Sequence, residues 1–145
     1  LLNARGISES LKDYLEALWT ENTEFAMIHV HVPEYTAFQR IYGEEAGNAL
    51  LYHIGDVLKG VFGRESSIGR PTGSYFTILI QDTDPDHLQK YRTKIQEDIS
   101  MLRTVGEWHC ALTAEVEASL MNQTNASRKI YAKNLDAMLT GFSTS

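Results

Sequence analysis

Two histidines stand two positions apart near the end of one apolar segment of this 145-residue chain. His29 and His31 would point to the same side of a β-strand, because side chains of a strand alternate between its two faces. Imidazole is a good zinc ligand, so the pair could seed a metal site with His53, His87 or His109. The spacing does not fix that third ligand. We therefore expect histidines that are satisfied by hydrogen bonds and solvent, with no metal and no other cofactor.

The single cysteine is a second candidate for chemistry. Cys110 follows His109, but neighbours on a strand point to opposite faces, so the imidazole is badly placed to activate the thiol. We expect Cys110 to pack in the core with Trp108 and Leu112. One cysteine cannot form an internal disulfide, which favours a reducing compartment and a cytoplasmic location.

The charge balance restricts the partners. The chain has 13 Lys and Arg residues against 19 Asp and Glu residues, a formal net charge of −6. The basic residues are scattered, whereas nucleic acid rewards clustered ones. No apolar run approaches the roughly 20 residues that span a bilayer. We expect no nucleic acid and no direct membrane contact. The abrupt start at Leu1 predicts that residues 1–145 are a single domain taken from a longer protein.

Apolar periodicity predicts the elements that would position these side chains. An opening helix is indicated by one stripe at helical spacing. Its members are Ile7, Leu11, Leu15, Leu18 and Trp19. The apolar run from Phe25 to Val32, stopped by Pro33, is typical of a buried strand. A short helix is expected from Glu34 to Tyr42, and a longer one from Glu44 to Phe62.

A hairpin and a further helix are predicted next. Ser67 to Arg70 and Tyr75 to Gln81 are strand-like, and Pro71 to Ser74 supplies turn residues between them. Asp84 suits a helix N-cap and Pro85 suits the first helical position. The apolar stripe of that helix consists of Leu88, Tyr91, Ile95, Ile99 and Leu102.

Strict alternation from Trp108 to Val116 predicts a half-exposed strand, and a final helix is expected from Ser127 to Leu139. The core order is then β-α-β-β-α-β, the ferredoxin-like arrangement. We therefore predict an α+β fold in which an antiparallel sheet is flanked by helices.

Three strings, in this order along the chain, are similar to motifs of the GGDEF family of diguanylate cyclases. Leu1 to Gly6 resembles the family's opening "LTGLxNRR", Tyr42 to Leu51 resembles "YGHxxGDxxL", and Gly69 to Phe76 falls where "xRxGGDEF" belongs. The resemblance implies the nucleotidyl-cyclase type of the ferredoxin-like fold. It also implies chemistry in which two protomers each supply a GTP molecule. Mg²⁺ ions held by carboxylates neutralise the phosphates.

Carried over one position at a time, the resemblance implies that the metal site has changed. The family's metal-binding Asp falls on His31, and the next acidic position falls on Pro33. The five signature positions fall on Thr72, Gly73, Ser74, Tyr75 and Phe76. His31, Ser74 and Tyr75 are not anionic oxygen ligands at neutral pH, so we expect no catalytic residues here. A Cβ at Thr72 also narrows the space in which backbone meets phosphate.

The nucleotide and inhibitory positions are altered as well. Thr36 stands where the family has a phosphate-contacting residue, and Gln39 and Asn48 stand where it binds guanine. An amide presents a donor and an acceptor where Asp presents two acceptors. The inhibitory Arg-x-x-Asp motif falls on Gly63 and Ser66. We therefore expect no nucleotide at the first three positions and no cyclic di-GMP at the last two.

These substitutions lead to a functional hypothesis. The chain is expected to be a domain without enzymatic activity. It would serve a bacterial cyclic di-GMP signalling protein as a regulatory, dimerisation or protein-interaction module, with attached domains or a second copy as partners. The alternative is a module that still binds GTP or cyclic di-GMP and controls an attached domain. The cleft between Val32, Gln39, Asn48 and Gly73 is where such a ligand would be sought.

Overall fold

The computed structural model describes residues 1–124, so the expected helix from Ser127 to Leu139 lies outside the described residues. Four helices and six strands are found in this part of the chain. Their order is α1 (Ala4–Glu21), β1 (Phe25–His31), α2 (Tyr35–Tyr42), α3 (Glu44–Val61), β2 (Ser67–Thr72), β3 (Tyr75–Ile80), α4 (Pro85–Ser100), β4 (Thr104–Val105), β5 (Trp108–His109) and β6 (Glu115–Met121).

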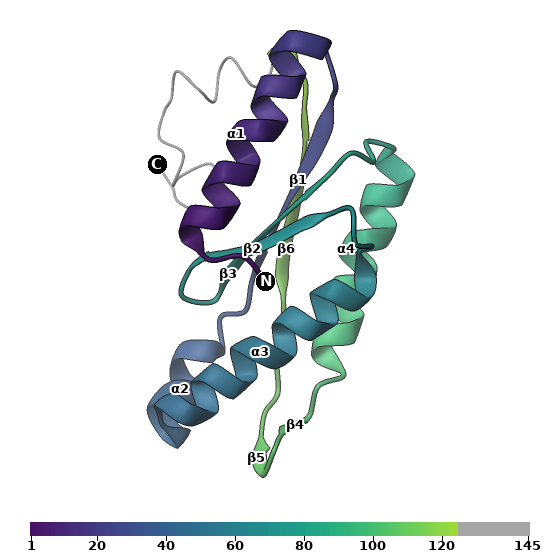
Figure 1. Ribbon diagram of the computed structural model, residues 1–145. Helices are drawn as coiled ribbons and strands as arrows, with labels where there is room; N and C mark the ends of the chain where they lie inside the picture. The colour runs from purple at the N-terminus through teal and green to yellow at the C-terminus, as the bar shows by residue number, and fades with distance from the viewer. Residues whose placement is uncertain (125–145) are drawn as a thin grey trace.

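Four strands form one antiparallel sheet in the order β2-β3-β1-β6. Its strands are connected as β1-α3-β2-β3-α4-β6, with α2 added before α3. This is the predicted ferredoxin-like arrangement, and the α+β prediction is confirmed. In Figure 1, α1 lies on one side of the sheet, and α3 and α4 lie on the other.

The two faces of the sheet carry separate apolar cores. Along β1, Ile28 and Val30 belong to the core that packs against α2, α3 and α4. Phe25 and Met27 point the other way, to a smaller core under α1. The strand is therefore apolar on both faces, as the uninterrupted run in the sequence predicts.

The helix ends follow the predicted chemistry. The Asn3 side chain accepts a hydrogen bond from the Gly6 N–H at 2.8 Å and caps α1. Asp84 caps α4 in the same way through the Asp86 N–H at 2.9 Å, and Pro85 follows it. One member of the predicted stripe of α1 is an exception, because Trp19 is 43% exposed.

The strand expected from Trp108 to Val116 is not continuous. β4 and β5 form a small hairpin around Gly106, whose φ of +59° suits glycine, and the sheet strand begins only at Glu115. The alternation in the sequence therefore runs across two strands and the link between them. Met121 ends β6 and is fully buried.

The hairpin between β2 and β3 is tighter than predicted. Thr72 pairs directly with Tyr75, which leaves Gly73 and Ser74 as a two-residue turn. The register shifts between Gly69 and Thr72, and Pro71 lies in that irregular part of β2. Proline cannot donate to a strand ladder, which accounts for its place at the irregularity.

The residues before α1 also join the sheet. Leu2 forms a parallel bridge with Gly69, on the outer edge of β2. Within residues 1–124, we find no helix with both the length and the apolar character needed to cross a membrane.

Candidate functional site

The signature turn lies beside the end of β1. Gly73 has a φ of +52°, and its carbonyl oxygen accepts a hydrogen bond from Arg70 Nη1 at 2.9 Å. Ser74 is buried, and its carbonyl oxygen accepts from the Val32 N–H at 3.3 Å. The turn is therefore held from both sides, by a side chain of β2 and by the backbone that follows β1.

Three side chains meet at this end of the sheet. His31 on β1 is paired in register with Tyr75 on β3 and with Glu115 on β6. The imidazole stacks on the Tyr75 ring with a centroid distance of 4.1 Å, and its Nδ1 lies 2.7 Å from Glu115 Oε1. The family's metal position is thus occupied by an imidazole with an aromatic ring and a carboxylate beside it.

His29 lies two residues before His31 on β1, on the same face of the sheet. It is buried, and its Nδ1 lies 3.4 Å from Thr77 Oγ1. His87 is elsewhere, at the start of α4, with its Nδ1 2.8 Å from Asp82 Oδ2. Within residues 1–124, no three His, Cys, Asp or Glu side chains are grouped so that they could hold a metal ion.

The helical pair α2–α3 carries the expected nucleotide positions. Thr36 and Asn48 are exposed, whereas Gln39 is half-buried against α3. A Cβ added at Gly47 would lie 2.9 Å from Gln39 Cγ, so the two helices approach closely at this point. The structure brings Gln39 next to the α3 turn that carries Asn48.

The entrance to α2 is fixed by Glu34. Its Oε1 accepts from the Thr113 N–H at 2.9 Å, and its Oε2 accepts from Thr113 Oγ1 at 2.6 Å. These bonds join the end of β1 to the segment that leads into β6. Glu34 and Glu115 together place two carboxylates near the end of β1, which position-by-position comparison with the family motif does not reveal.

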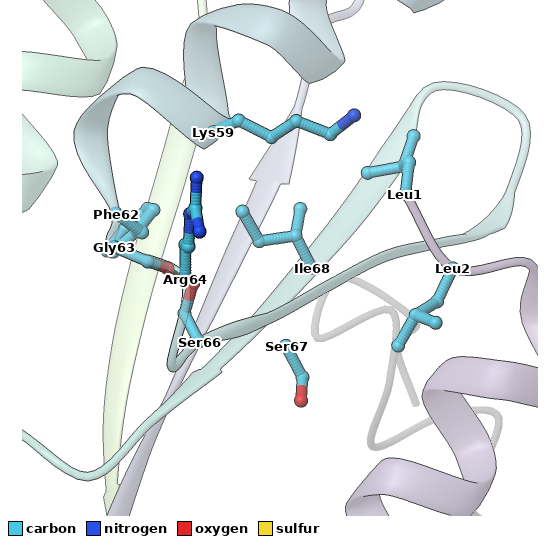
Figure 2. A pocket seen from close by; sticks show the side chains of 9 residues that line it. All are labelled: Leu1, Leu2, Lys59, Phe62, Gly63, Arg64, Ser66, Ser67 and Ile68. Carbon is cyan, nitrogen blue, oxygen red and sulfur yellow. Dashed lines mark hydrogen bonds between the residues drawn. The ribbon is translucent and has the colours of Figure 1, made fainter.

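A hollow of about 480 Å³ opens between the residues before α1, the end of α3 and the start of β2. Figure 2 shows Lys59 reaching across it from α3 and Arg64 from the following loop, with Leu1 and Leu2 on the opposite side. Ile68 lies between the two sides. The hollow thus has apolar side chains on both sides, with the Lys59 ammonium near Leu1 and Arg64 beside Phe62.

The two inhibitory-motif positions line this same hollow. Ser66 Oγ donates to the Gly63 carbonyl oxygen at 2.6 Å, which closes the loop after α3. Among residues 1–124, neither Lys59 nor Arg64 forms an ion pair, and no acidic side chain lines the hollow. The sequence analysis assigned no role to Lys59 or Arg64. Their five-residue spacing across a helix end was the available signal.

Cys110 is half-buried, and its S–H donates to the Leu102 carbonyl oxygen at 3.5 Å. Burial raises the pKa of the thiol, with a smaller opposing effect from Arg103. The residue packs against the larger core together with Trp108, as expected. A protonated thiol in this setting is a poor nucleophile.

One protein family matches nearly the whole chain in sequence. The family model described as "Diguanylate cyclase, GGDEF domain" matches residues 1–140. No curated protein sequence matches significantly.

Solved structures share the fold. The diguanylate cyclase SiaD of Pseudomonas aeruginosa, in complex with its activator SiaC, is 19% identical with a TM-score of 0.74; the match covers 96% of this chain and 55% of SiaD. The active GGEEF domain of a Vibrio cholerae diguanylate cyclase is 14% identical with a TM-score of 0.75, covering 86% and 79%. The GGDEF domain of DgcB from Caulobacter crescentus, in complex with c-di-GMP, is 15% identical with a TM-score of 0.75, covering 97% and 86%. The chain therefore spans about half of the SiaD chain.

These comparisons contradict the expectation that the chain is not an enzyme. The matching family is that of diguanylate cyclases, and an active domain of this kind has the same fold. The expectation rested on side-chain types at a few aligned positions. Comparison of those positions does not show Glu115, which brings a carboxylate from β6 to His31.

Proposed function

Since this chain belongs to the GGDEF family of diguanylate cyclase domains, we propose that it binds a guanine nucleotide, cyclic di-GMP in the first place, and thereby regulates an attached domain of a cyclic di-GMP signalling protein. The single cysteine suits the reducing cytoplasm, where we place the domain.

One observation carries the proposal: two cations without acidic partners and several apolar side chains line the same hollow. A cyclic dinucleotide combines two phosphate charges with two flat bases, and it needs both kinds of surface. Arginine pairs well with phosphate because its planar fork donates two parallel hydrogen bonds. The hollow also has the size of a small-molecule site, for which roughly 300–1,000 Å³ is usual.

The position of the hollow supports the same ligand. Gly63 and Ser66 line it, and the family resemblance places the inhibitory motif there. The proposal departs from the expectation drawn from those two residues alone, because Lys59 and Arg64 bring charge to the same place from other positions. DgcB, which has this fold, was solved with c-di-GMP bound.

Isothermal titration of the purified domain with cyclic di-GMP tests the proposal, with GTP and GDP titrated separately. Arg64→Ala should weaken binding of cyclic di-GMP by roughly tenfold or more, since a charge-assisted hydrogen bond contributes about 1.5–3 kcal/mol. Lys59→Ala should weaken it less. Lys90→Ala and Arg92→Ala on α4 make the same charge change on exposed residues that do not line this hollow, and they should leave the affinity unchanged.

Two results would remove the proposal. One is the absence of any binding of cyclic di-GMP to the unaltered domain. The other is equal weakening by Arg64→Ala and by the α4 variants, which would show a general charge effect and no defined site.

A second candidate function is contact with an attached domain or with a second copy of the chain. Ile41 at the end of α2 is 70% exposed, and Tyr52 on α3 is 69% exposed. Exposed apolar side chains mark a contact surface where they adjoin in one patch, and these two lie on neighbouring helices. Sedimentation of the unaltered domain against Ile41→Ser and Tyr52→Ser variants should show loss of self-association in the variants. A monomer at all concentrations would exclude the second copy as the partner.

A further inference from the structure

Leu1 and Leu2, here called the leader, form one wall of the hollow and also dock on the edge of the sheet. We infer that the leader is a latch: its docking on β2 and the binding of an anionic ligand in the hollow favour each other. This inference rests on the proposed function, because the ligand is the one assigned to Lys59 and Arg64. It adds a regulatory role for the segment that leads into α1.

The latch is held by backbone hydrogen bonds. The Leu2 N–H donates to the Ile68 carbonyl oxygen at 2.9 Å, and the Arg70 N–H donates to the Leu2 carbonyl oxygen at 3.0 Å. One leader residue therefore extends the sheet past its outer strand. Arg70 in turn donates to the Gly73 carbonyl oxygen, so the bonded segment of β2 continues into the signature turn.

Side chains around the latch fit closely. A Cβ added at Gly69 would lie 2.5 Å from Ile7 Cβ, so α1 packs directly on the β2 backbone. Ser10 Oγ on α1 donates to Ser67 Oγ on β2 at 2.6 Å. A Cβ added at Gly55 would lie 3.3 Å from Leu1 Cδ2, which places Leu1 against α3. The leader thus contacts β2 and α3 at once.

Coupling follows from this arrangement. When the leader is docked, Leu1 and Leu2 line the hollow together with Lys59 and Arg64. When the leader lifts, the apolar contacts that Leu1 and Leu2 offer are lost and that part of the hollow opens to water. A ligand that touches the leader as well as the two cations binds the docked state better, and by thermodynamic linkage it must strengthen docking by the same factor.

Hydrogen exchange and titration with cyclic di-GMP test the latch together. Leu2→Pro removes the N–H that bonds to Ile68, whereas Leu2→Ala keeps it and serves as the matched control. Without ligand, Leu2→Pro should speed exchange of the Arg70 amide by about tenfold or more. Because both variants remove the Leu2 side chain from the hollow, the effect of docking is the difference between them: Leu2→Pro should bind cyclic di-GMP about fivefold or more weakly than Leu2→Ala, the usual lower limit of coupling between sites. In the unaltered domain, saturating cyclic di-GMP should slow exchange at Arg70.

A second pair of variants tests the latch from the side of α1. Gly69→Ala should push Ile7 away and produce the same two effects as Leu2→Pro. Gly60→Ala is its control, because a Cβ added there meets nothing within 4 Å. Circular dichroism spectra serve as the check that each variant is folded.

The outcomes separate the latch from the proposed function. If the unaltered domain does not bind cyclic di-GMP, both fail. If Leu2→Pro exchanges rapidly at Arg70 yet binds cyclic di-GMP as tightly as Leu2→Ala, the coupling fails and the proposed function stands. If exchange at Arg70 is unchanged in Leu2→Pro, the leader is not a latch.

Discussion

Residues that are distant in sequence meet at the end of β1 and in the hollow, and the neighbours of each side chain there determine what it can bind. His31 has Tyr75 stacked on it and Glu115 within hydrogen-bond distance. Lys59 and Arg64 face a hollow without an ion pair to any described residue. Cations in that state attract anions more strongly than cations already paired with carboxylates.

Asp82, beyond the end of β3, permits a prediction about pH. Burial would raise the pKa of its carboxyl, but hydrogen bonds from the Asp84 N–H, His87 and Tyr91 outweigh burial, and the pKa is lowered. A carboxyl with a depressed pKa stabilises the fold above its unfolded pKa of about 3.9 and loses that contribution as the pH falls through the lower folded value. Asp82→Asn should therefore unfold at a lower temperature than the unaltered domain at pH 7. The difference should shrink as the pH falls below about 4.

Thermal melts followed by circular dichroism across that pH range measure the effect of Asp82→Asn. Asp56→Asn, at an exposed position on α3, is the control for the loss of one negative charge. A difference between Asp82→Asn and the unaltered domain that stays constant down to pH 2 would contradict the assignment.

At the scale of elements, α2 and α3 form a pair that is tied to the sheet at its entrance. Glu34 holds the start of α2 to the segment before β6, and Gly47 lets α3 approach α2. The hydrogen bonds between Glu34 and Thr113 connect residues 79 positions apart in sequence. They therefore set the position of α2 without any contribution from helix propensity.

A double-mutant cycle should measure the contact between Glu34 and Thr113. Glu34→Gln leaves one acceptor where the carboxylate offers two, and Thr113→Val removes the hydroxyl donor. Each change should lower the free energy of unfolding by about 1 kcal/mol, with a coupling energy of about 0.5–1.5 kcal/mol between them. Urea denaturation of the four proteins provides the values. Strict additivity of the two changes would show that the contact contributes nothing.

For the whole molecule, the sheet divides two apolar cores that must form together. The smaller core holds α1 on the sheet through Ile7, Leu11, Leu15 and Leu18. Since α1 also carries the leader, the stability of this core decides how firmly one wall of the hollow is held.

Leu18→Ala tests the smaller core. Leu18 is fully buried, so its truncation should lower the free energy of unfolding by about 2–5 kcal/mol. Glu16→Ala, on the exposed side of α1, should change it by less than about 0.5 kcal/mol. Denaturation followed by tryptophan fluorescence and by circular dichroism should give coincident transitions in both variants, because the cores share one sheet. Separate transitions would show that α1 unfolds alone.

The sequence alone determined most of the elements and their order. Apolar periodicity, Asp84 before Pro85 and the glycine in the hairpin turn are local signals. They predicted β1, α3 and β3 to within one residue, the start of α4, and the existence of α1. The strand near the C-terminal end was placed wrongly, because alternation persists across the β4–β5 hairpin and does not record where the chain leaves one strand for another.

Only the tertiary structure decided which side chains share a site. Glu115 reaches His31 across 84 positions, and the hollow joins Leu1 and Leu2 to Lys59 and Arg64. Such encounters depend on strand register and helix docking, and these arise from packing of the entire chain. The aligned motifs identified the family, but they did not reveal the charged side chains that other segments bring to its sites. Sequence spacing does not show which residues lie close together in the fold.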